Sequence, residues 1–249
     1  MDRWRGKTAV VTGASAGIGY AITTSLLEAG INVVGCARNP TSLEELQSKL
    51  PSHAGKLTAL KSDLSKEEEI LLLFKEIQAN FGHADILINN AGTAILGNLS
   101  DADTEGWRTM LDLNILATNI CTREFLKLLE KDGLDTGHII NINSVAGHTI
   151  YPVNMGSYYY SATKHMITAL TKGLIHELSQ KKSKIRVTSL SPGLVNTPLV
   201  ANIQKSSEHG QIWTRAALEG KDIADAVLYI LGTPPNVVVT ELTITPGPS

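Results

Sequence analysis

Short apolar runs alternate along the chain with longer segments in which apolar residues recur at every third or fourth position. The short runs are rich in valine, isoleucine and threonine and are bounded by glycine or polar residues, a pattern typical of buried parallel strands. The longer segments have the period of amphipathic helices. We expect strands at residues 7–12, 32–37, 56–61, 86–89, 138–142, 186–190 and 237–245.

Helices are expected between these strands. Thr41 and Ser65 each precede a glutamate by three residues, which predicts capping boxes at the starts of two helices. The second of these helices is expected to end near Phe81. Further helices are expected up to Gly30 and over residues 104–130 and 221–231.

Strand and helix alternate from the first residues to the last, and this order predicts an α/β fold. Right-handed crossovers then give a doubly wound sheet of about seven mainly parallel strands with helices on both faces. No linker divides the chain, so residues 1–249 are expected to form a single domain. Residues 198–218 have no clear period, and both a mobile lid over a substrate and a plain surface helix are compatible with them.

Charge and composition argue against nucleic-acid binding, membrane binding and a membrane-spanning segment. A net charge of −2 at pH 7 provides no basic field for nucleic acid or an anionic membrane, so a small ligand is the expected partner. No run approaches the roughly 18 apolar residues of a membrane span, and the N-terminus has no signal-peptide core, so we expect a soluble cytoplasmic protein. Cys36 and Cys121 lie in apolar segments and are expected to be reduced and buried, and the histidine spacing indicates no metal site.

A glycine-rich turn, Gly13-Ala-Ser-Ala-Gly17-Ile18-Gly19, follows the first strand at once. Glycines allow a backbone to approach a pyrophosphate, and the next helix supplies amide hydrogens and a partial positive charge. The turn is therefore a candidate phosphate cradle, although an ordinary tight turn is the alternative. Arg38 lies about 20 residues further on, just past the second strand, where a dinucleotide site contacts the adenosine ribose. Its planar fork suits a 2′-phosphate, and the alternative is a solvated loop arginine.

Tyr160 and Lys164 are four residues apart in a segment with helical period, so they share one face of a helix. A phenol ionises near pH ~10 in water, and a neighbouring ammonium lowers that pKa by stabilising the phenolate. The pair is a candidate acid-base catalyst, and the alternative is a packed phenol with a solvated amine. Ser144 stands just beyond a strand, at the edge where open α/β sheets bind ligands. The helix face expected to be buried consists of Ala162, Met166, Ile167, Leu170, Leu174 and Leu178.

Together these motifs resemble the short-chain dehydrogenase/reductase family over nearly the whole chain. The resemblance rests on the glycine turn in the form Thr-Gly-x-x-x-Gly-x-Gly, and on Asn89-Asn90-Ala91-Gly92, Asn114, Ser144, Tyr160, Lys164 and Pro192-Gly193, in the family's order and spacing. It implies a Rossmann-type domain that binds a nicotinamide dinucleotide. Ala37 fills the position where members that prefer NAD carry aspartate, so the resemblance, together with Arg38, implies NADP(H).

Two departures from the family pattern are visible. Some NADP-dependent members carry a basic residue inside the glycine turn, where this chain has Ala16. Many relatives end in an Asp-Gly-Gly-like turn, whereas this chain ends in Thr-Pro-Gly-Pro-Ser249. The second departure affects the far wall of the pocket and the contacts between subunits.

The resemblance also assigns roles to residues. It implies a catalytic set in which Tyr160 exchanges the proton, Ser144 contacts the substrate oxygen, and Asn114 keeps a water beside Lys164. For Asn114 the alternative is a polar contact between helices, and for Asp63 it is a turn before the next helix. Ser144 and Tyr160 are the expected substrate-binding residues. The expected cofactor-binding residues are Gly13, Ser15, Gly17, Ile18, Gly19, Arg38, Asn39, Asp63, Leu64, Asn90, Ala91, Gly92, Tyr160, Lys164, Pro192, Gly193, Val195 and Thr197.

The implied function is NADP-dependent interconversion of an alcohol and an aldehyde or ketone by hydride transfer. Residues 34–38 and 138–144 are similar to the branch of the family that holds insect farnesol dehydrogenases, and vertebrate reductases of steroids and other carbonyls resemble it too. The expected substrate is therefore a lipophilic alcohol such as farnesol, and a broad carbonyl or hydroxysteroid reductase is the alternative. A non-catalytic NADP-binding redox sensor is a third hypothesis, disfavoured by the intact catalytic set. Family analogy predicts a homodimer or homotetramer.

Between the fifth strand and Tyr160 the chain forms a loop that we expect to shape the substrate pocket. His148 in this loop is expected to be solvated or bonded to the backbone, and it is left out of the catalytic set. Tyr158 and Tyr159 have no lysine four residues later and are interpreted as pocket wall or core.

Overall fold

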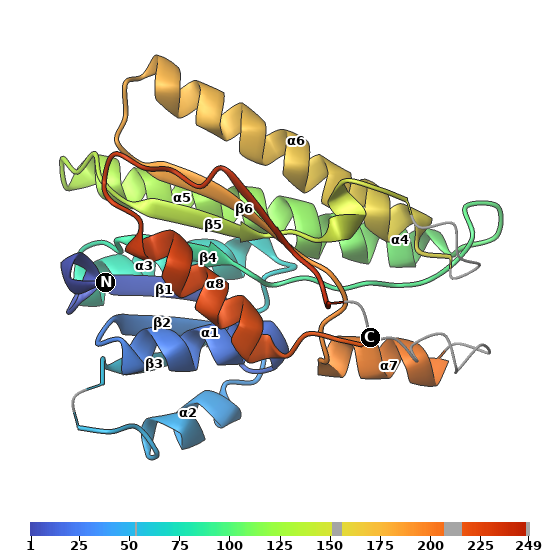
Figure 1. The fold of residues 1–249 in the computed structure, drawn as a ribbon, viewed down its shortest axis with the longest axis horizontal. Helices are drawn as coiled ribbons and strands as arrows, with labels where there is room; N and C mark the ends of the chain where they lie inside the picture. Colours follow the sequence, from blue (N-terminus) through green and yellow to red (C-terminus); the bar gives the residue numbers. More distant parts are fainter. Residues whose placement is uncertain (53, 151–155, 207–215, 248–249) are drawn as a thin grey trace.

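The computed structural model in Figure 1 describes residues 1–52, 54–150, 156–206 and 216–247. A seven-stranded sheet with the order β3-β2-β1-β4-β5-β6-β7 runs through the centre, and every neighbouring pair is parallel. This confirms the doubly wound α/β sheet expected from the sequence. Its strands are β1 (Thr8–Thr12), β2 (Asn32–Ala37), β3 (Leu57–Lys61), β4 (Ile86–Asn89), β5 (His138–Ile142), β6 (Arg186–Pro192) and β7 (Glu241–Ile244).

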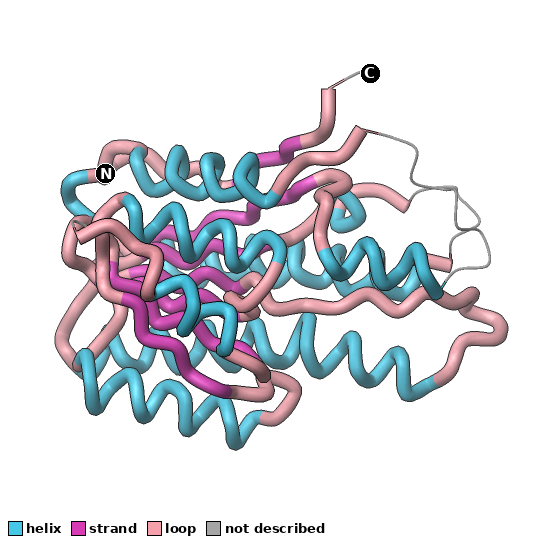
Figure 2. Tube along the Cα trace, turned by 90° about the horizontal axis from the view of Figure 1, so that it is seen from below, coloured by secondary structure: helices cyan, strands magenta, loops and turns pink. Residues whose placement is uncertain are grey.

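The helices are α1 (Gly17–Glu28), α2 (Thr41–Gln47), α3 (Glu67–Phe81), α4 (Thr104–Met110), α5 (Ala117–Lys131), α6 (Tyr158–Gln180), α7 (Pro198–Ser206) and α8 (Gly220–Gly232). They lie on both faces of the sheet (Figure 2). On one face α1, α2 and α8 enclose a core that includes Leu26 and Val227. On the other face α3, α5 and α6 enclose a second core that includes Phe74 and Phe125. No helix within the described ranges is long and apolar enough to span a bilayer.

Three short helical segments complete the described part of the chain. The 3-10 helices η1 (Asp2–Trp4) and η3 (Val145–Gly147) precede β1 and follow β5. The π-helical segment η2 (Leu111–Leu116) joins α4 to α5, so residues 104–131 form one continuous helical run. The long helix expected over 104–130 is therefore confirmed, with an irregular turn in its middle.

The expected last strand over 237–245 is too long, because pairing with β6 covers only Glu241–Ile244. Val237 and Val238 are 40% and 43% exposed, and the carbonyl oxygen of Val237 accepts a hydrogen bond from the Arg186 side chain. An apolar run at the edge of the sheet has only one neighbouring strand, so hydrophobicity alone does not determine how far the ladder extends.

The two expected capping boxes are wrong. The hydroxyl of Thr41 donates to Oδ1 of Asn39, and the hydroxyl of Ser65 donates to Oδ1 of Asp63. In both cases a side-chain oxygen two residues earlier binds the hydroxyl in a local turn, so the hydroxyl does not cap the helix. The structure has its capping box at the start of α8, between Glu219 and Asp222.

The expected buried face of α6 is wrong in part. Ile167 and Leu178 are buried as expected, but Met166 and Leu170 are 41% and 39% exposed, and Ala162 is exposed too. The inward face is largely polar and includes Ser161, Thr163, Lys164, Thr168 and Thr171. Lys164, Thr168 and Thr171 have partners at the ends of the strands, such as the bond of 2.9 Å from Asn141 Nδ2 to Thr171 Oγ1, which makes their burial tolerable. The hydroxyl of Ser161 has no partner among the described residues.

Candidate active site

The glycine turn joins β1 to α1 at the carboxyl edge of the sheet. Gly13 and Gly17 have φ angles of +64° and +54°, a backbone region that favours glycine. A Cβ atom at Gly19 would collide with the carbonyl oxygen of Gly13 and with the Asn90 side chain. The backbone is therefore folded tightly upon itself at the N-terminus of α1, as an anion-binding turn requires.

Asn90 closes this turn from the neighbouring strand end. Its Nδ2 donates to the carbonyl oxygens of Thr12 at 2.8 Å and Gly13 at 3.1 Å. In return, the hydroxyl oxygen of Thr12 accepts the backbone N–H groups of Asn90 and Ala91 at 2.9 and 3.0 Å. Thr12 is the first residue of the Thr-Gly-x-x-x-Gly-x-Gly motif, but the sequence alone assigned it no role. Gly92 lies next along, where a Cβ would be 3.2 Å from Oδ1 of Asn114.

The ends of β2 and β3 bring Arg38 and Asp63 together. Arg38 is exposed directly after β2. A hydrogen bond from Ser65 lowers the pKa of Asp63, and the charges of Lys66 and Arg38 lower it further, against the effect of burial. Asn39 uses its amide oxygen to bind the backbone and hydroxyl of Thr41, which leaves its Nδ2 for other partners. The three predicted residues thus form one polar corner beside the glycine turn.

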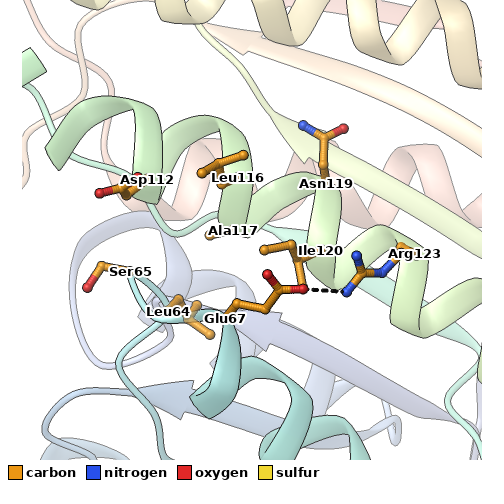
Figure 3. A pocket seen from close by; sticks show the side chains of 9 residues that line it. All are labelled: Leu64, Ser65, Glu67, Asp112, Leu116, Ala117, Asn119, Ile120 and Arg123. Atoms are coloured by element: carbon orange, nitrogen blue, oxygen red, sulfur yellow. Dashed lines mark hydrogen bonds and ion pairs between the residues drawn. The ribbon is translucent and has the colours of Figure 1, made fainter. Parts of the chain in front are cut away.

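Leu64 is buried, and its side chain lines a groove of about 550 Å³ between the turn after β3 and the helices η2 and α5. Figure 3 shows this groove, with Leu116 and Ile120 on one wall and the ion pair of Arg123 with Glu67, 2.9 Å long, at one end. Leu64 therefore lies in a groove that none of the predicted catalytic residues lines.

The predicted catalytic side chains do meet, at the start of α6. The Nζ atom of Lys164 is 5.8 Å from the centroid of the Tyr160 ring and donates to the carbonyl oxygen of Ile142 at 3.0 Å. Ser144 caps η3 by accepting the N–H of Ala146 at 3.1 Å, and it also hydrogen-bonds the Tyr160 hydroxyl. Lys164 is only 8% exposed. A phenol, a hydroxyl and a buried amine therefore converge on one point at the end of β5.

Burial dominates the electrostatics of this cluster. It lowers the pKa of Lys164 to about 8 and raises the pKa of Tyr160, which the hydrogen bond with Ser144 lowers only in part. We expected Lys164 to lower the pKa of Tyr160, and in this chain the direction is the opposite, because loss of solvent penalises the phenolate more than its neighbours stabilise it.

Asn114 lies in the π-helical segment and is 2% exposed. Its amide bonds both backbone groups of Thr93, at 2.8 and 2.9 Å, and donates to the hydroxyl of Thr163 at 3.1 Å. This is the polar contact between elements that was the alternative for Asn114, and it ties the loop after β4 to α6. The role of Asn114 beside a water and Lys164 stays a prediction.

The end of β6 approaches the glycine turn. The N–H of Gly193 donates to the carbonyl oxygen of Ile244 at 2.7 Å, so Pro192 and Gly193 are held by β7. A Cβ atom at Gly17 would lie 3.2 Å from Cγ2 of Thr197, which shows that the segment after β6 packs on the cradle. The predicted phosphate and nicotinamide segments therefore face each other, as in a single extended cofactor site.

The chain just before residues 198–218 is hydrogen-bonded to the end of this segment. Val195 forms a parallel bridge with Leu218, and the N–H of Leu218 donates to the carbonyl oxygen of Leu194 at 2.8 Å. The first part of the segment is α7, which agrees with the surface-helix hypothesis, and residues 207–215 lie outside the described residues. The lid hypothesis therefore stays a prediction. Residues 151–155 of the expected substrate loop also lie outside the described part.

Tyr159 and His148, two side chains in the region of the expected substrate loop, both contact other side chains. Tyr159 stacks on Trp107 with ring centroids 5.0 Å apart, which agrees with a role in the wall or core. His148 is bonded to side chains instead of backbone, with Nε2 2.9 Å from Oγ of Ser191 and 3.2 Å from Oε1 of Glu241. Within the described residues, no group of three histidine, cysteine or acidic side chains is arranged to hold a metal ion.

The family model for short chain dehydrogenases matches residues 7–208. The chain belongs to the short-chain dehydrogenase family. It is 43% identical over 251 residues to dehydrogenase/reductase SDR family member 11 of Gallus gallus, covering 99% of this chain and 98% of the relative. It is 45% identical over 248 residues to the farnesol dehydrogenase of Aedes aegypti, with the same coverage of 99% and 98%. As a short-chain dehydrogenase, the chain is an oxidoreductase.

Solved structures of the family have the same fold. A serine dehydrogenase in its closed form with NADP+ is 30% identical and superposes with a TM-score of 0.84, covering 95% of this chain and 94% of that one. A metagenomic short-chain oxidoreductase in complex with NADP is 29% identical, with a TM-score of 0.80 and 99% of each chain covered. The expected family and its Rossmann-type architecture are confirmed.

Proposed function

We propose that this short-chain dehydrogenase interconverts an alcohol and an aldehyde or ketone with NADP(H), and that residues 1–249 act as one cofactor-binding unit. One observation carries the proposal: the buried Lys164, the Tyr160 hydroxyl and Ser144 converge at the end of β5. Burying an amine at 8% exposure makes its charged form costly, and buried ionisable groups with altered pKa values cluster at functional sites.

Several residues fit NADP(H). The turn with Gly13, Gly17 and Gly19 suits the pyrophosphate, because a side chain at Gly19 would collide with the turn itself. Arg38, exposed at the end of β2, suits a 2′-phosphate, which its planar guanidinium binds in bidentate fashion. Gly193 and its neighbours suit the nicotinamide end. The NADP complexes of the 30% and 29% identical structures support this choice over NAD.

The bound nicotinamide would supply or accept the hydride. In the reductive direction Tyr160 donates its hydroxyl proton to the carbonyl oxygen, and in the oxidative direction its phenolate takes the alcohol proton. Ser144 donates a hydrogen bond to the same oxygen and stabilises the negative charge that develops there. Lys164, held by the Ile142 carbonyl oxygen, would place a positive charge near the phenol, and the bound oxidised nicotinamide would add its own charge. Together these charges would offset the burial that raises the pKa of Tyr160.

For the substrate, a lipophilic alcohol such as farnesol is supported by the 45% identical Aedes aegypti farnesol dehydrogenase. The alternative is a broad carbonyl or hydroxysteroid reductase. The names of the 43% and 41% identical dehydrogenase/reductase SDR family member 11 of Gallus gallus and of Homo sapiens include a reductase activity, which is compatible with it. The two hypotheses differ in which direction and which carbon skeleton give the higher kcat/KM.

The test follows nicotinamide absorbance while purified protein meets farnesol with NADP, with NAD in a parallel sample. Rapid reduction of NADP alone would support both Arg38 and the isoprenoid substrate. Equal use of NAD would contradict the role of Arg38. Turnover restricted to ketones or steroids with NADPH would favour the carbonyl reductase, and cofactor binding without turnover on any alcohol or carbonyl would favour a redox sensor.

We also propose that the protein forms a homodimer or homotetramer. The partly exposed apolar side chains of Met166 and Leu170 on the outer face of α6 support this, because a second copy would remove them from water. Light scattering after size-exclusion chromatography would measure the mass, and a monomer at micromolar concentration would contradict the proposal. The cytoplasmic location expected from the sequence stays a prediction.

A further inference from the structure

The carboxylate of Glu241 lies on the edge strand of the sheet and yet bonds two buried side chains. It begins β7 and is paired in register with Ser189 of β6. Its Oε1 accepts the hydroxyl of Ser189 at 3.1 Å and that of Ser191 at 2.6 Å. Ser189 and Ser191 are two residues apart and share one face of β6, so a single carboxylate binds both. Both serines are buried, at 1% and 0% exposure.

His148 joins the same carboxylate from another element. Its Nε2 is 2.9 Å from Oγ of Ser191 and 3.2 Å from Oε1 of Glu241. Because Ser191 donates its one hydrogen to Glu241, its oxygen is left to accept, so His148 carries a hydrogen on Nε2. The cluster therefore has a consistent set of donors and acceptors, with Glu241 as the shared acceptor.

The composition of this cluster matches a serine, histidine and acid triad, but its geometry does not. In such triads the acid and the nucleophile bond opposite nitrogens of the imidazole. Here Ser191 and Glu241 both contact Nε2, and the Ser191 hydroxyl donates its hydrogen bond directly to the carboxylate. The serine is also fully buried, so a substrate does not reach it. A hydrolytic role is excluded on these grounds.

The two elements that the cluster joins both belong to the candidate active site. The 3-10 turn η3 lies between Ser144 and His148, which flank it on either side. Two backbone hydrogen bonds close the turn: the N–H of Gly147 donates to the carbonyl oxygen of Ser144 at 2.8 Å, and the N–H of His148 donates to that of Val145 at 3.0 Å. Ser191 is followed directly by Pro192 and Gly193 in the sequence. The cluster thus connects the turn that carries Ser144 to the strand end assigned to the nicotinamide. Figure 1 shows β5 and β6 side by side at this edge.

We propose that Glu241, acting through His148 and Ser191, is a positioning residue that fixes the Ser144 turn relative to the Pro192–Gly193 segment. This inference rests on the proposed function, because the distance it would fix is the one between the substrate oxygen and the nicotinamide. A small change in this distance lowers the rate of hydride transfer, since a shift of about 1 Å between reacting groups slows a reaction by up to about a hundredfold.

The experiment compares Glu241→Ala, His148→Ala, their double variant and the conservative Glu241→Gln. Glu177→Ala is the matched control, because it also removes a carboxylate that bonds one neighbouring side chain, in this case Lys181 at 2.7 Å, and it lies outside the cluster. Each variant is assayed for kcat, KM, NADPH affinity by fluorescence, melting temperature, and the isotope effect with NADPH deuterated at the transferred hydrogen.

We expect Glu241→Ala and His148→Ala to lower kcat by about tenfold or more, with NADPH affinity changed by less than about twofold, because alignment is lost while binding contacts remain. The isotope effect should rise as hydride transfer becomes limiting. The double variant should lose no more than the worse single variant, since the two residues act through one contact. Glu241→Gln, which keeps an acceptor for the serines, should recover part of kcat.

A kcat of Glu241→Ala and His148→Ala within about twofold of Glu177→Ala would overturn the inference, as would additive losses in the double variant. A lower melting temperature with unchanged kcat would also overturn it, because it would indicate a purely structural role. If Glu241→Ala does not fold, the partly exposed His148 still provides the decisive variant. Absence of turnover by the unmodified protein on every alcohol and carbonyl would overturn the proposed function first, and the inference with it.

Discussion

The Nζ atom of Lys164 donates a hydrogen bond of 3.0 Å to the carbonyl oxygen of Ile142, at the end of β5. This bond fixes the amine at the root of the Ser144 turn. It satisfies one of the three ammonium hydrogens, while burial at 8% exposure leaves the charge poorly solvated. The position of Lys164 is therefore favourable for catalysis and unfavourable for stability.

Lys164→Met should separate these two effects. Burial lowers the pKa of Lys164 from 10.5 to about 8, so the folded protein holds the proton less tightly than the unfolded chain does. At pH 7 this costs stability, and the cost is relieved as the pH rises from about 8 towards 10.5. We expect the free energy of unfolding of Lys164→Met, measured with urea at pH 7, to rise by about 1 to 3 kcal/mol, and its turnover to fall by about a hundredfold.

Lys172→Met, at an exposed position of the same helix, is the control and should change neither quantity. A destabilised Lys164→Met protein would contradict the first expectation.

Tyr160→Phe removes the proposed proton carrier and keeps the ring. We expect NADPH affinity to stay within about twofold and kcat to fall by about 10² to 10⁴, the range for loss of an acid-base group. Steady-state kinetics and a fluorescence titration with NADPH measure the two quantities. Tyr159→Phe is the control, since that ring stacks on Trp107 and its hydroxyl has no proposed role. Substantial residual activity in Tyr160→Phe would overturn the assignment.

Arg38→Ala should change cofactor preference without changing the chemistry. We expect the KM for NADPH to rise by about tenfold to a hundredfold, because a charge-assisted bidentate contact is lost, while the KM for NADH stays the same. Arg108→Ala removes another exposed arginine, on α4, and serves as the control. An equal effect on both cofactors would show that Arg38 does not contact the 2′-phosphate.

His138 predicts a pH dependence of stability that is independent of catalysis. It is fully buried on β5, with Nε2 2.8 Å from Oγ1 of Thr188, and burial lowers its pKa from 6.5 to about 3. The unfolded chain binds the proton below pH 6.5 and the folded chain does not, so stability is full above 6.5 and is lost as the pH falls towards 3. The contribution is about 1.4 kcal/mol per pH unit for one proton.

Urea unfolding between pH 4 and pH 7 measures this slope. In His138→Gln the slope should flatten by about 1.4 kcal/mol per pH unit, whereas His176→Gln, at an exposed position on α6, should keep the slope of the unmodified protein. If both variants keep the slope of the unmodified protein, His138 takes up a proton in the folded state and the burial argument fails.

The sequence was sufficient for the sheet, because buried parallel strands and amphipathic helices have distinct periods. It also identified Ser144, Tyr160 and Lys164, which the fold brings together from two elements. It was not sufficient for the orientation of α6, where apolar Met166 and Leu170 are partly exposed and polar Thr171 is buried. Hydrogen bonds with the strand ends determine that orientation, and periodicity contains no information about them.

The contacts that hold the site together were also beyond the sequence. Thr12, Thr93 and Glu241 act through bonds to residues more than 20 positions away, and their residue types are common on any surface. Asn114 shows the same limit, because the sequence indicated that a mid-helix asparagine needs a partner but not that Thr93 is that partner. Only the folded backbone defines such pairs.

The parallel bridge between Val195 and Leu218 bears on how well this chain tolerates changes in length. The chain leaves the cofactor side of the site at Val195 and returns to the same point, so the intervening stretch behaves as an insertion whose two ends are already joined. Replacing it would add little closure entropy, because that cost grows only slowly with length. A change in the number of residues between these two ends should therefore alter the free energy of unfolding only slightly, as long as Thr197, which packs on Gly17, is kept.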